Sequence, residues 1–218
     1  MLCALAAAGL SCGAGARATE PTLLDQFAKR WATIDDYTAT IVAHEVDGTR
    51  TDDRTFRFWF RKPDHAKLEM TEGYDRGTVV LWTGGSRVHV HVAGLGLIPL
   101  SYGIHDSKVT SMRGNSIARP NLGPTIDCFE QHRDAVRAGS GPTIDGRATQ
   151  TLTLEIDGGL GCPGEPAQDR DVTKDVLTMT RDDGFVVLRE RYAGDSLVER
   201  WELRDLRVNV GLTDSDFR

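Results

Sequence analysis

Apolar and polar residues alternate with a period of two through residues 178–217, and this alternation limits the stretch to β-structure. Successive side chains of a strand point to opposite faces of a sheet, so a strand with one buried face shows this period. Turn sequences at 182–184 (Asp-Asp-Gly) and 193–195 (Ala-Gly-Asp) divide the stretch. The sequence therefore predicts three antiparallel strands here. The apolar positions in the last part are Leu197, Trp201 and Leu203, followed by Leu206, Val208, Val210 and Leu212.

Residues 1–18 have the layout of a secretory signal peptide. An apolar stretch at 2–10 is followed by small residues and a cleavage-type sequence that ends at Ala18. We therefore expect cleavage after Ala18, a single domain over residues 19–218, and a periplasmic or secreted protein. Two alternatives stay open: a disordered Ala/Gly-rich leader, and a lipoprotein signal that would tether the protein to a membrane through Cys12. No later stretch approaches the roughly 18 apolar residues that span a bilayer.

The formal net charge of the chain is -6. Phosphate contacts need a clustered basic face, so this acidic balance argues against nucleic acid as a partner. The 218 residues, of which 39% are hydrophobic, are enough for one well-buried domain. No internal repeat and no linker divides residues 19–218, and we expect a monomer without a cofactor.

Cys128 and Cys162 are the two cysteines that remain after removal of the leader. In an oxidising compartment an isolated pair favours one disulfide, and two separate buried thiols are the alternative. Cys162 lies in a long loop, residues 158–171, that is rich in Gly, Pro and Asp. A loop of this length usually has a structural or functional reason, and a Cys128–Cys162 disulfide would supply one.

Two helices are predicted within an otherwise extended chain. Residues 22–34 carry apolar side chains at three- and four-residue steps, with Thr22 and Asp25 as a capping box. Residues 122–138 form the second helix, with Asn121 as its cap and Gly139 as its stop. Period-two patterns predict further strands at 37–46, 55–61, 66–71, 77–83, 87–92 and 150–157.

Signals for catalysis are weak. His89 and His91 lie two apart on a predicted strand and point to one face, an arrangement that a metal-dependent hydrolase would use if a third ligand joined them. A strand in which polar and apolar residues alternate and one face is exposed to solvent explains the pair equally well. The sequence has no nucleophile elbow and no phosphate loop, so we assign no catalytic and no metal residue. Charged residues of the last strands are expected to pair on a solvated outer face: Arg189, Arg191, Arg200 and Arg204 with Glu190, Glu199 and Glu202.

The order of the predicted elements resembles a known family. An amphipathic helix, a strand meander, a central helical segment and closing strands that end near Asp216-Phe217 follow one another as in the periplasmic outer-membrane lipoprotein carriers, the LolA-like superfamily. Residues 111–117 (Ser-Met-Arg-Gly-Asn-Ser-Ile) and 121–123 (Asn-Leu-Gly) are more similar to an uncharacterised family of secreted bacterial proteins of the same fold. The resemblance implies an α+β fold without enzymatic activity. In this fold a curved antiparallel sheet, a half-open β-barrel, wraps on helices and leaves an apolar hollow.

Several strands carry more apolar side chains than one core face needs, and the excess either fills the core or lines a ligand cavity. One strand register would point a set of them to the concave face: Phe56, Phe58, Phe60, Leu68, Met70, Val88 and Val90. The glycine-broken apolar stretch at 95–100 is a candidate lid or a buried crossover, with Leu95, Leu97, Ile98 and Leu100 as its apolar residues.

We therefore expect a non-enzymatic binding protein for a lipid or an acyl chain. An envelope lipoprotein or a membrane receptor would be its partner in exchanging that ligand. An envelope sensor or interaction module is the alternative, and a metal-dependent hydrolase that uses His89 and His91 is a weaker one.

Overall fold

The computed structural model describes residues 22–73, 75–94 and 99–218. The predicted leader with Cys12 and three candidate lid residues, Leu95, Leu97 and Ile98, lie outside the described residues. The helices are α1 (Leu23–Ala32), α2 (Leu122–Gln131) and the short 3-10 helices η1 (Arg133–Ala135), η2 (Ala167–Asp169) and η3 (Asp214–Phe217). The strands are β1 (Asp36–Asp47), β2 (Arg50–Arg61), β3 (His65–Glu72), β4 (Val79–Thr83), β5 (Arg87–His91), β6 (Leu100–Gly103), β7 (Val136–Ser140), β8 (Thr149–Glu155), β9 (Lys174–Thr180), β10 (Val186–Ala193) and β11 (Ser196–Val208).

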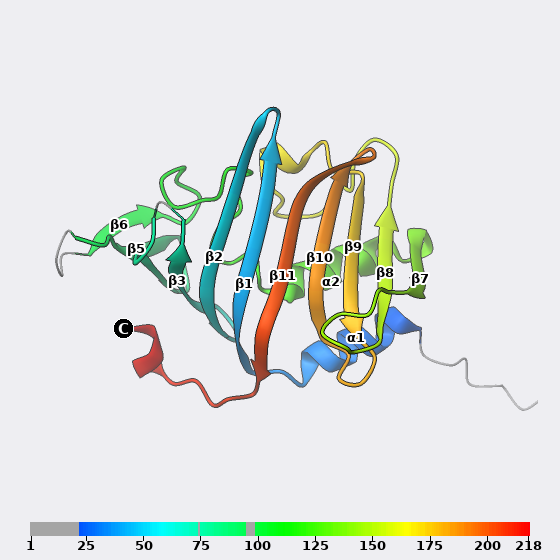
Figure 1. Cartoon of the computed structure of the whole chain (residues 1–218), viewed down its shortest axis with the longest axis horizontal. Coiled ribbons are helices and arrows are strands. Elements are labelled where there is room, and N and C mark those ends of the chain that lie inside the picture. Colours follow the sequence, from blue (N-terminus) through cyan, green and yellow to red (C-terminus); the bar gives the residue numbers. More distant parts are fainter. Residues whose placement is uncertain (1–21, 74, 95–98) are drawn as a thin grey trace, which may run out of the picture.

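The strands of the described chain form one antiparallel sheet in the order β6-β5-β4-β3-β2-β1-β11-β10-β9-β8-β7. Strands β1 to β6 form a meander, and β11 returns to pair with β1, so the first and last strands meet in the middle. The β1–β2 hairpin keeps one register from the pair Asp36 and Arg61 to the pair Asp47 and Arg50. Figure 1 shows a strongly curved sheet, with both helices behind its β11 to β7 half. The three closing strands and the curved, open sheet predicted from the sequence are confirmed.

Helix α1 begins at the capping box that the sequence predicts. The Thr22 hydroxyl accepts a hydrogen bond from the Asp25 backbone N–H at 3.2 Å, and the Asp25 carboxylate accepts one from the Thr22 N–H at 2.8 Å. Two orphan donors of the first turn are thereby satisfied. The apolar stripe is buried, and the ring of Trp31 stacks on Phe60 with ring centroids 5.9 Å apart. The helix therefore packs on the concave face of β2.

Helix α2 is shorter than the sequence predicts. Asn121 caps it as expected, but the helix ends at Gln131 and does not reach residue 138. Residues 136–140 instead form the edge strand β7, in which Val136 lies opposite Leu154 of β8. Without β7, the backbone donors and acceptors on this edge of β8 would have no partners. Pairing with the sheet therefore outweighs the helix propensity of these residues.

The last strand ends earlier than the alternation predicts. Strand β11 stops at Val208, and Asn209 and Gly211 have positive φ angles of 54° and 81°. The Asp36 carboxylate accepts hydrogen bonds from the backbone N–H groups of residues 210, 211 and 212 at 2.7, 3.0 and 3.0 Å. This turn leads the chain back toward the β3 and β4 strands, where Phe217 is buried.

The predicted disulfide between Cys128 and Cys162 is confirmed. The two Cα atoms are 5.2 Å apart and 34 residues apart in sequence, and the bond ties α2 to the loop at 156–173. Leu160 and Val172 of this loop are 2% and 0% exposed. The long loop is therefore part of the core and is held against the helix.

Candidate functional site

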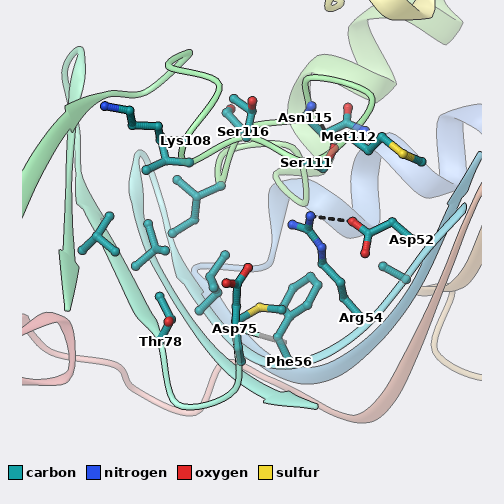
Figure 2. Close-up of a pocket in the computed structure, with 18 of the residues that line it drawn as sticks. Asp52, Arg54, Phe56, Asp75, Thr78, Lys108, Ser111, Met112, Asn115 and Ser116 are labelled. Carbon is teal, nitrogen blue, oxygen red and sulfur yellow. Dashed lines mark hydrogen bonds and ion pairs between the residues drawn. The ribbon is translucent and has the colours of Figure 1, made fainter. Parts of the chain in front are cut away.

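A cavity of about 400 Å³ lies between the concave side of the β1 to β5 strands and the loop segment 107–117, which we call the covering segment. Both helices lie behind the other half of the sheet (Figure 1), except that Trp31 of α1 reaches Phe60 of β2. Among the described residues, strands and loops line the cavity, and no helix does. Figure 2 shows Phe56, Asp75 and Thr78 on the sheet side and Ser111 and Asn115 on the opposite side. The fold thus leaves room where no helix fills the concave face.

The sheet side of the cavity is apolar. Antiparallel pairing without shifts brings alternate residues of neighbouring strands to the same face. The wall is therefore continuous across four strands and does not depend on a single side chain. Its paired positions are Phe56 with Met70, Phe58 with Leu68, Leu68 with Val80, and Val80 with Val90.

The structure places the seven predicted cavity residues in two groups. Five line the cavity: Phe56, Phe58, Leu68, Met70 and Val90. Phe60 and Val88 do not, and both are 0% exposed. Phe60 packs against Trp31 and Tyr37 at centroid distances of 5.9 and 5.5 Å. The alternation identified the face but not which parts of it are covered. Phe60 is covered by α1, and Val88 is likewise buried in the core.

The covering segment that the structure describes was not among the residues that the sequence analysis named as a lid. Of the four predicted lid residues the structure describes Leu100, which begins β6 and pairs with Val90 as part of the sheet. Leu95, Leu97 and Ile98 lie outside the described residues. The signal for the covering segment was present in residues 111–117, where a charged and an amide side chain, Arg113 and Asn115, stand between the apolar residues Met112 and Ile117.

Arg113 anchors the covering segment and is only 2% exposed. Its guanidinium donates to Asp169 at 3.2 Å, to Asp171 at 2.7 Å and to the Val46 carbonyl at 3.0 Å. Its backbone N–H donates to the Glu45 carboxylate at 3.1 Å. The segment is therefore held to the β1–β2 hairpin on one side and to the 156–173 loop on the other.

Part of the charged outer face predicted for the last strands is in fact buried. Arg191 and Glu199 are 0% and 1% exposed, and Arg191 contacts Asp169 as well as Glu199. Arg189 donates to the Asp175 carboxylate with a closest approach of 2.5 Å. The 156–173 loop covers these residues and supplies Asp169, which the alternation could not reveal. The expected pairing between partly exposed side chains is found for Arg200 with Glu190 and Glu202, and for Arg204 with Glu202.

Burial shifts the pKa values of the charged side chains that lie between the sheet, the covering segment and the 156–173 loop; we call these side chains the charged cluster. Burial, and then the neighbouring Glu199 carboxylate, raises the pKa of Glu45. Burial would also raise the pKa of Asp175, but the Arg189 guanidinium outweighs it and lowers that pKa. Burial, reinforced by the nearby arginines, lowers the pKa of Arg119 to about 10. The cluster is thus a set of mutually dependent charges, in which loss of one partner leaves another buried and unpaired.

One end of the cavity is polar because the residues on the concave face of β2 change from aromatic to charged along the strand. Beyond Phe56 the next two residues on that face are Arg54 and Asp52, whose side chains approach to 2.5 Å (Figure 2). Neighbouring strands add Glu45, opposite Asp52, and Trp201, which lies in the same cross-strand row as Arg54. Together with Asn115 of the covering segment they form what we call the polar end: Glu45, Asp52, Arg54, Asn115 and Trp201.

Three polar atoms at the polar end have no hydrogen-bond partner among the described residues. They are Nε of Arg54, Oδ1 of Asn115 and Nε1 of Trp201. Asn115 and Trp201 are 5% and 6% exposed. The amide nitrogen of Asn115 does have partners, since it donates to Glu45 at 2.9 Å and to Glu199 at 3.1 Å. Buried polar atoms are paired in most proteins, so these three need partners from outside the chain, either ordered water or a polar group of a ligand.

The histidine pair does not acquire a third ligand in the part of the chain that the structure describes. His89 is exposed on β5 and lies opposite Ser101, and His91 lies opposite Val79. No group of three or more His, Cys, Asp or Glu side chains within the described residues could hold a metal ion. Among the same residues, no helix has the length and the apolar character needed to cross a membrane.

A second hollow of about 620 Å³ lies on the other side of the covering segment. Its lining includes Arg119, Glu165 and Gln168 of the charged loop region. Ser107, Thr110, Asn115 and Ser116 border both hollows, so the covering segment forms the partition between them. The second hollow is larger, but its described lining consists of polar residues, prolines, glycines and alanines without a wall of large apolar side chains, and we take the first as the candidate site.

No model of a protein family matches this chain, and no curated protein matches its sequence. Solved structures do match. LprF from Mycobacterium bovis has a TM-score of 0.52 and 11% identity, with 88% of this chain and 93% of that chain covered. An uncharacterized conserved protein from Thermus thermophilus has a TM-score of 0.52 and 9% identity, with 89% and 90% covered. The LolA superfamily protein NE2245 from Nitrosomonas europaea has a TM-score of 0.43 and 12% identity, with 91% and 98% covered.

At these identities the likeness concerns the fold alone. The two matches with a TM-score of 0.52 cover 88 to 89% of this chain and 90 to 93% of the other. The sheet is antiparallel and open, and its concave side faces both helices, as the sequence resemblance implied. This chain therefore shares its fold with LprF and with the Thermus thermophilus protein.

Proposed function

We propose that this protein is a secreted or periplasmic, non-enzymatic carrier that binds the apolar chain of a lipid or of an acylated molecule in the 400 Å³ cavity. The observation that carries the proposal is the continuous apolar wall from β2 to β5, closed by the covering segment and not by a helix. Burial of an acyl chain gains about 0.8 kcal/mol per methylene. A chain of about a dozen carbons would therefore bind even after the entropy cost of association.

Export of the protein is supported by the disulfide between Cys128 and Cys162. Such bonds form and persist in oxidising compartments such as the periplasm. We propose that residues 1–18 are removed as a signal peptide and that residues 19–218 form one binding domain. A lipid anchor at Cys12 is the alternative, and it would keep the same cavity close to a membrane.

The proposed partners follow from the chemistry of the ligand. An acyl chain is poorly soluble, so a carrier must receive it from, and pass it to, a membrane or a protein that holds it. An envelope lipoprotein or a membrane receptor fits this requirement. The carrier itself would act as a monomer, with no metal and no cofactor.

The experiment combines extraction with a variant that fills the cavity. Protein purified from the periplasm is extracted with organic solvent, and mass spectrometry is expected to detect an acyl-chain compound. In parallel, binding of an acyl chain with a fluorophore at its end is titrated. Leu68→Trp replaces a leucine of the cavity wall by a larger indole side chain. We expect this variant to bind the probe at least about tenfold more weakly, because the indole occupies cavity volume that several methylene groups of the ligand would need.

The matched control is Val79→Trp. Val79 is the neighbour of Val80, a cavity residue, but as the next residue on the strand it points to the opposite face. It should bind the probe like the wild type, and circular dichroism should show that both variants fold. Failure of the wild-type protein to bind the probe, together with an extract free of lipid, would overturn the proposal in favour of a sensor or interaction module.

A further inference from the structure

We propose that the polar end of the cavity recognises the head group of an amphiphile that has one acyl chain and an uncharged head bearing hydroxyl or amide groups. The inference rests on the proposed function, because the apolar wall must hold the chain. It goes further by naming the class of ligand and the residues that select it: Arg54, Asn115 and Trp201 as contacts, and Asp52 as the group that sets the charge preference.

The size of the cavity limits the ligand to one chain. A methylene group occupies about the volume of one molecule of liquid water, about 30 Å³. A cavity of about 400 Å³ therefore holds on the order of a dozen such groups. Two or three acyl chains of ordinary length would not fit beneath the covering segment.

The charges around the cavity disfavour an ionised head. Arg54 is already paired with Asp52 at 2.5 Å, so its guanidinium is not a free cation. The other charged residues that line the cavity are Glu45, Asp75 and Lys108, which leaves no excess of positive charge. A carboxylate or phosphate would lie beside Asp52 and Glu45. An ammonium would lie beside the Arg54 guanidinium, and the two carboxylates that would attract it already accept from Arg54, Asn115 and the Arg113 N–H. Like charges in a desolvated site are costly, so a neutral head is favoured.

The unpaired polar atoms match what a hydroxyl or an amide offers. Nε of Arg54 and Nε1 of Trp201 are donors, and Oδ1 of Asn115 is an acceptor. A hydroxyl group both donates and accepts, so it can pair with either kind. Asn115 and Trp201 are more than nine-tenths buried, and a polar head would meet them within the cavity that both residues line.

The spacing of the donors favours a head with more than one polar group. Arg54 and Trp201 each lie opposite Ala43, on the two strands that flank β1. Two strand spacings amount to about 10 Å between their backbones. A glycerol head, which has two hydroxyls and an ester, has groups for both sides, whereas a simple alcohol does not.

The wild-type protein is tested by competition of three ligands with the same dodecyl-length chain against a fluorescent acyl-chain probe at neutral pH. Monolauroylglycerol is expected to bind at least about tenfold more tightly than laurate or laurylamine. Equal affinities, or tighter binding of laurate or laurylamine, would overturn the head-group inference and leave chain binding intact. If none of the three displaces the probe and the probe itself does not bind, the proposed function fails as well.

A variant that binds one ligand more tightly than the wild type provides a second test, because a folding defect would weaken binding and could not produce this result. Asp52→Asn removes the partner charge of Arg54, so the guanidinium becomes available to an anion. Laurate should then bind about tenfold more tightly than to the wild type, and the ratio of its affinity to that of monolauroylglycerol should rise. Asp53→Asn is the matched control, because Asp53 is the next residue, is exposed and pairs with His44 on the other face. If Asp52→Asn leaves the affinity for laurate unchanged, or if Asp53→Asn raises it equally, the assignment of the head-group site is wrong.

Discussion

At the scale of single residues, Glu45 is the most constrained group of the site. It is 4% exposed, lies directly opposite Glu199 across β1 and β11, and accepts hydrogen bonds from Asn115 and the Arg113 backbone. Burial and then the Glu199 carboxylate raise its pKa. One residue thus joins the polar end of the cavity to the anchor of the covering segment.

Glu45→Gln should weaken the dependence of the protein's stability on pH. Because the pKa of Glu45 is higher in the folded than in the unfolded chain, the folded state binds more protons, and stability falls as the pH rises above the ordinary pKa of glutamate. Glutamine carries no charge, but its one amide oxygen replaces one of the two accepting oxygens of Glu45, so either the hydrogen bond from Asn115 or that from the Arg113 N–H is lost. We expect the free energy of unfolding of the variant, relative to that of the wild type, to rise by on the order of 1 kcal/mol from acidic to neutral pH, measured by urea unfolding.

Glu190→Gln is the control for this prediction. Glu190 lies on the partly exposed face and pairs with Arg200 at 3.7 Å, so its replacement should change stability by less than about 0.5 kcal/mol. A difference in stability between Glu45→Gln and the wild type that stays the same from acidic to neutral pH would contradict the account of this site.

At the scale of elements, the covering segment and the 156–173 loop are fixed by a disulfide and by buried ion pairs. The 156–173 loop is tied to α2 by the disulfide and meets Arg113 of the covering segment through Asp169 and Asp171. Arg191 of β10 contacts the same loop. The disulfide therefore supports the position of the covering segment from a distance.

Replacement of both cysteines, in the double variant Cys128→Ala/Cys162→Ala, should lower the free energy of unfolding by about 3 to 4 kcal/mol. The reason is the entropy that the unfolded chain regains when the closed loop of 34 residues opens. Urea unfolding with and without a reductant measures the effect. Reductant should destabilise the wild type by a similar amount and leave the double variant unchanged, and insensitivity of the wild type to reductant would contradict the prediction.

The elements that periodicity reveals were predicted, and those set by tertiary contacts were not. Alternation along β2 identified the face that holds Phe56 and Phe58, and the capping box located the start of α1. Such local patterns could not show that β7 would form at an edge, that a distant loop would cover Arg191, or that residues 107–117 would cover the cavity. Each of these depends on partners at least 10 residues away in sequence, and the contact between Arg113 and Glu45 joins residues 68 apart.

At the scale of the whole molecule, the cavity follows from an imbalance between the sheet and its helices. The sheet is long and curved, but both helices lie behind its β11 to β7 half (Figure 1). The other half keeps an apolar concave face that only the covering segment and its neighbours meet. A larger helical layer would turn the same face into an ordinary core, as α1 does around Phe60.

The most direct measurement of the central claim is photo-crosslinking with monolauroylglycerol that carries a diazirine at the end of its acyl chain. After illumination, peptide mass spectrometry should locate the adducts on cavity-facing residues of β3 to β5, such as Leu68, Val80 and Val90. Unlabelled monolauroylglycerol should compete with the labelling. Adducts that do not respond to competitor, or that lie on the opposite face of these strands at Lys67 or Val79, would contradict the claim that this cavity holds the chain.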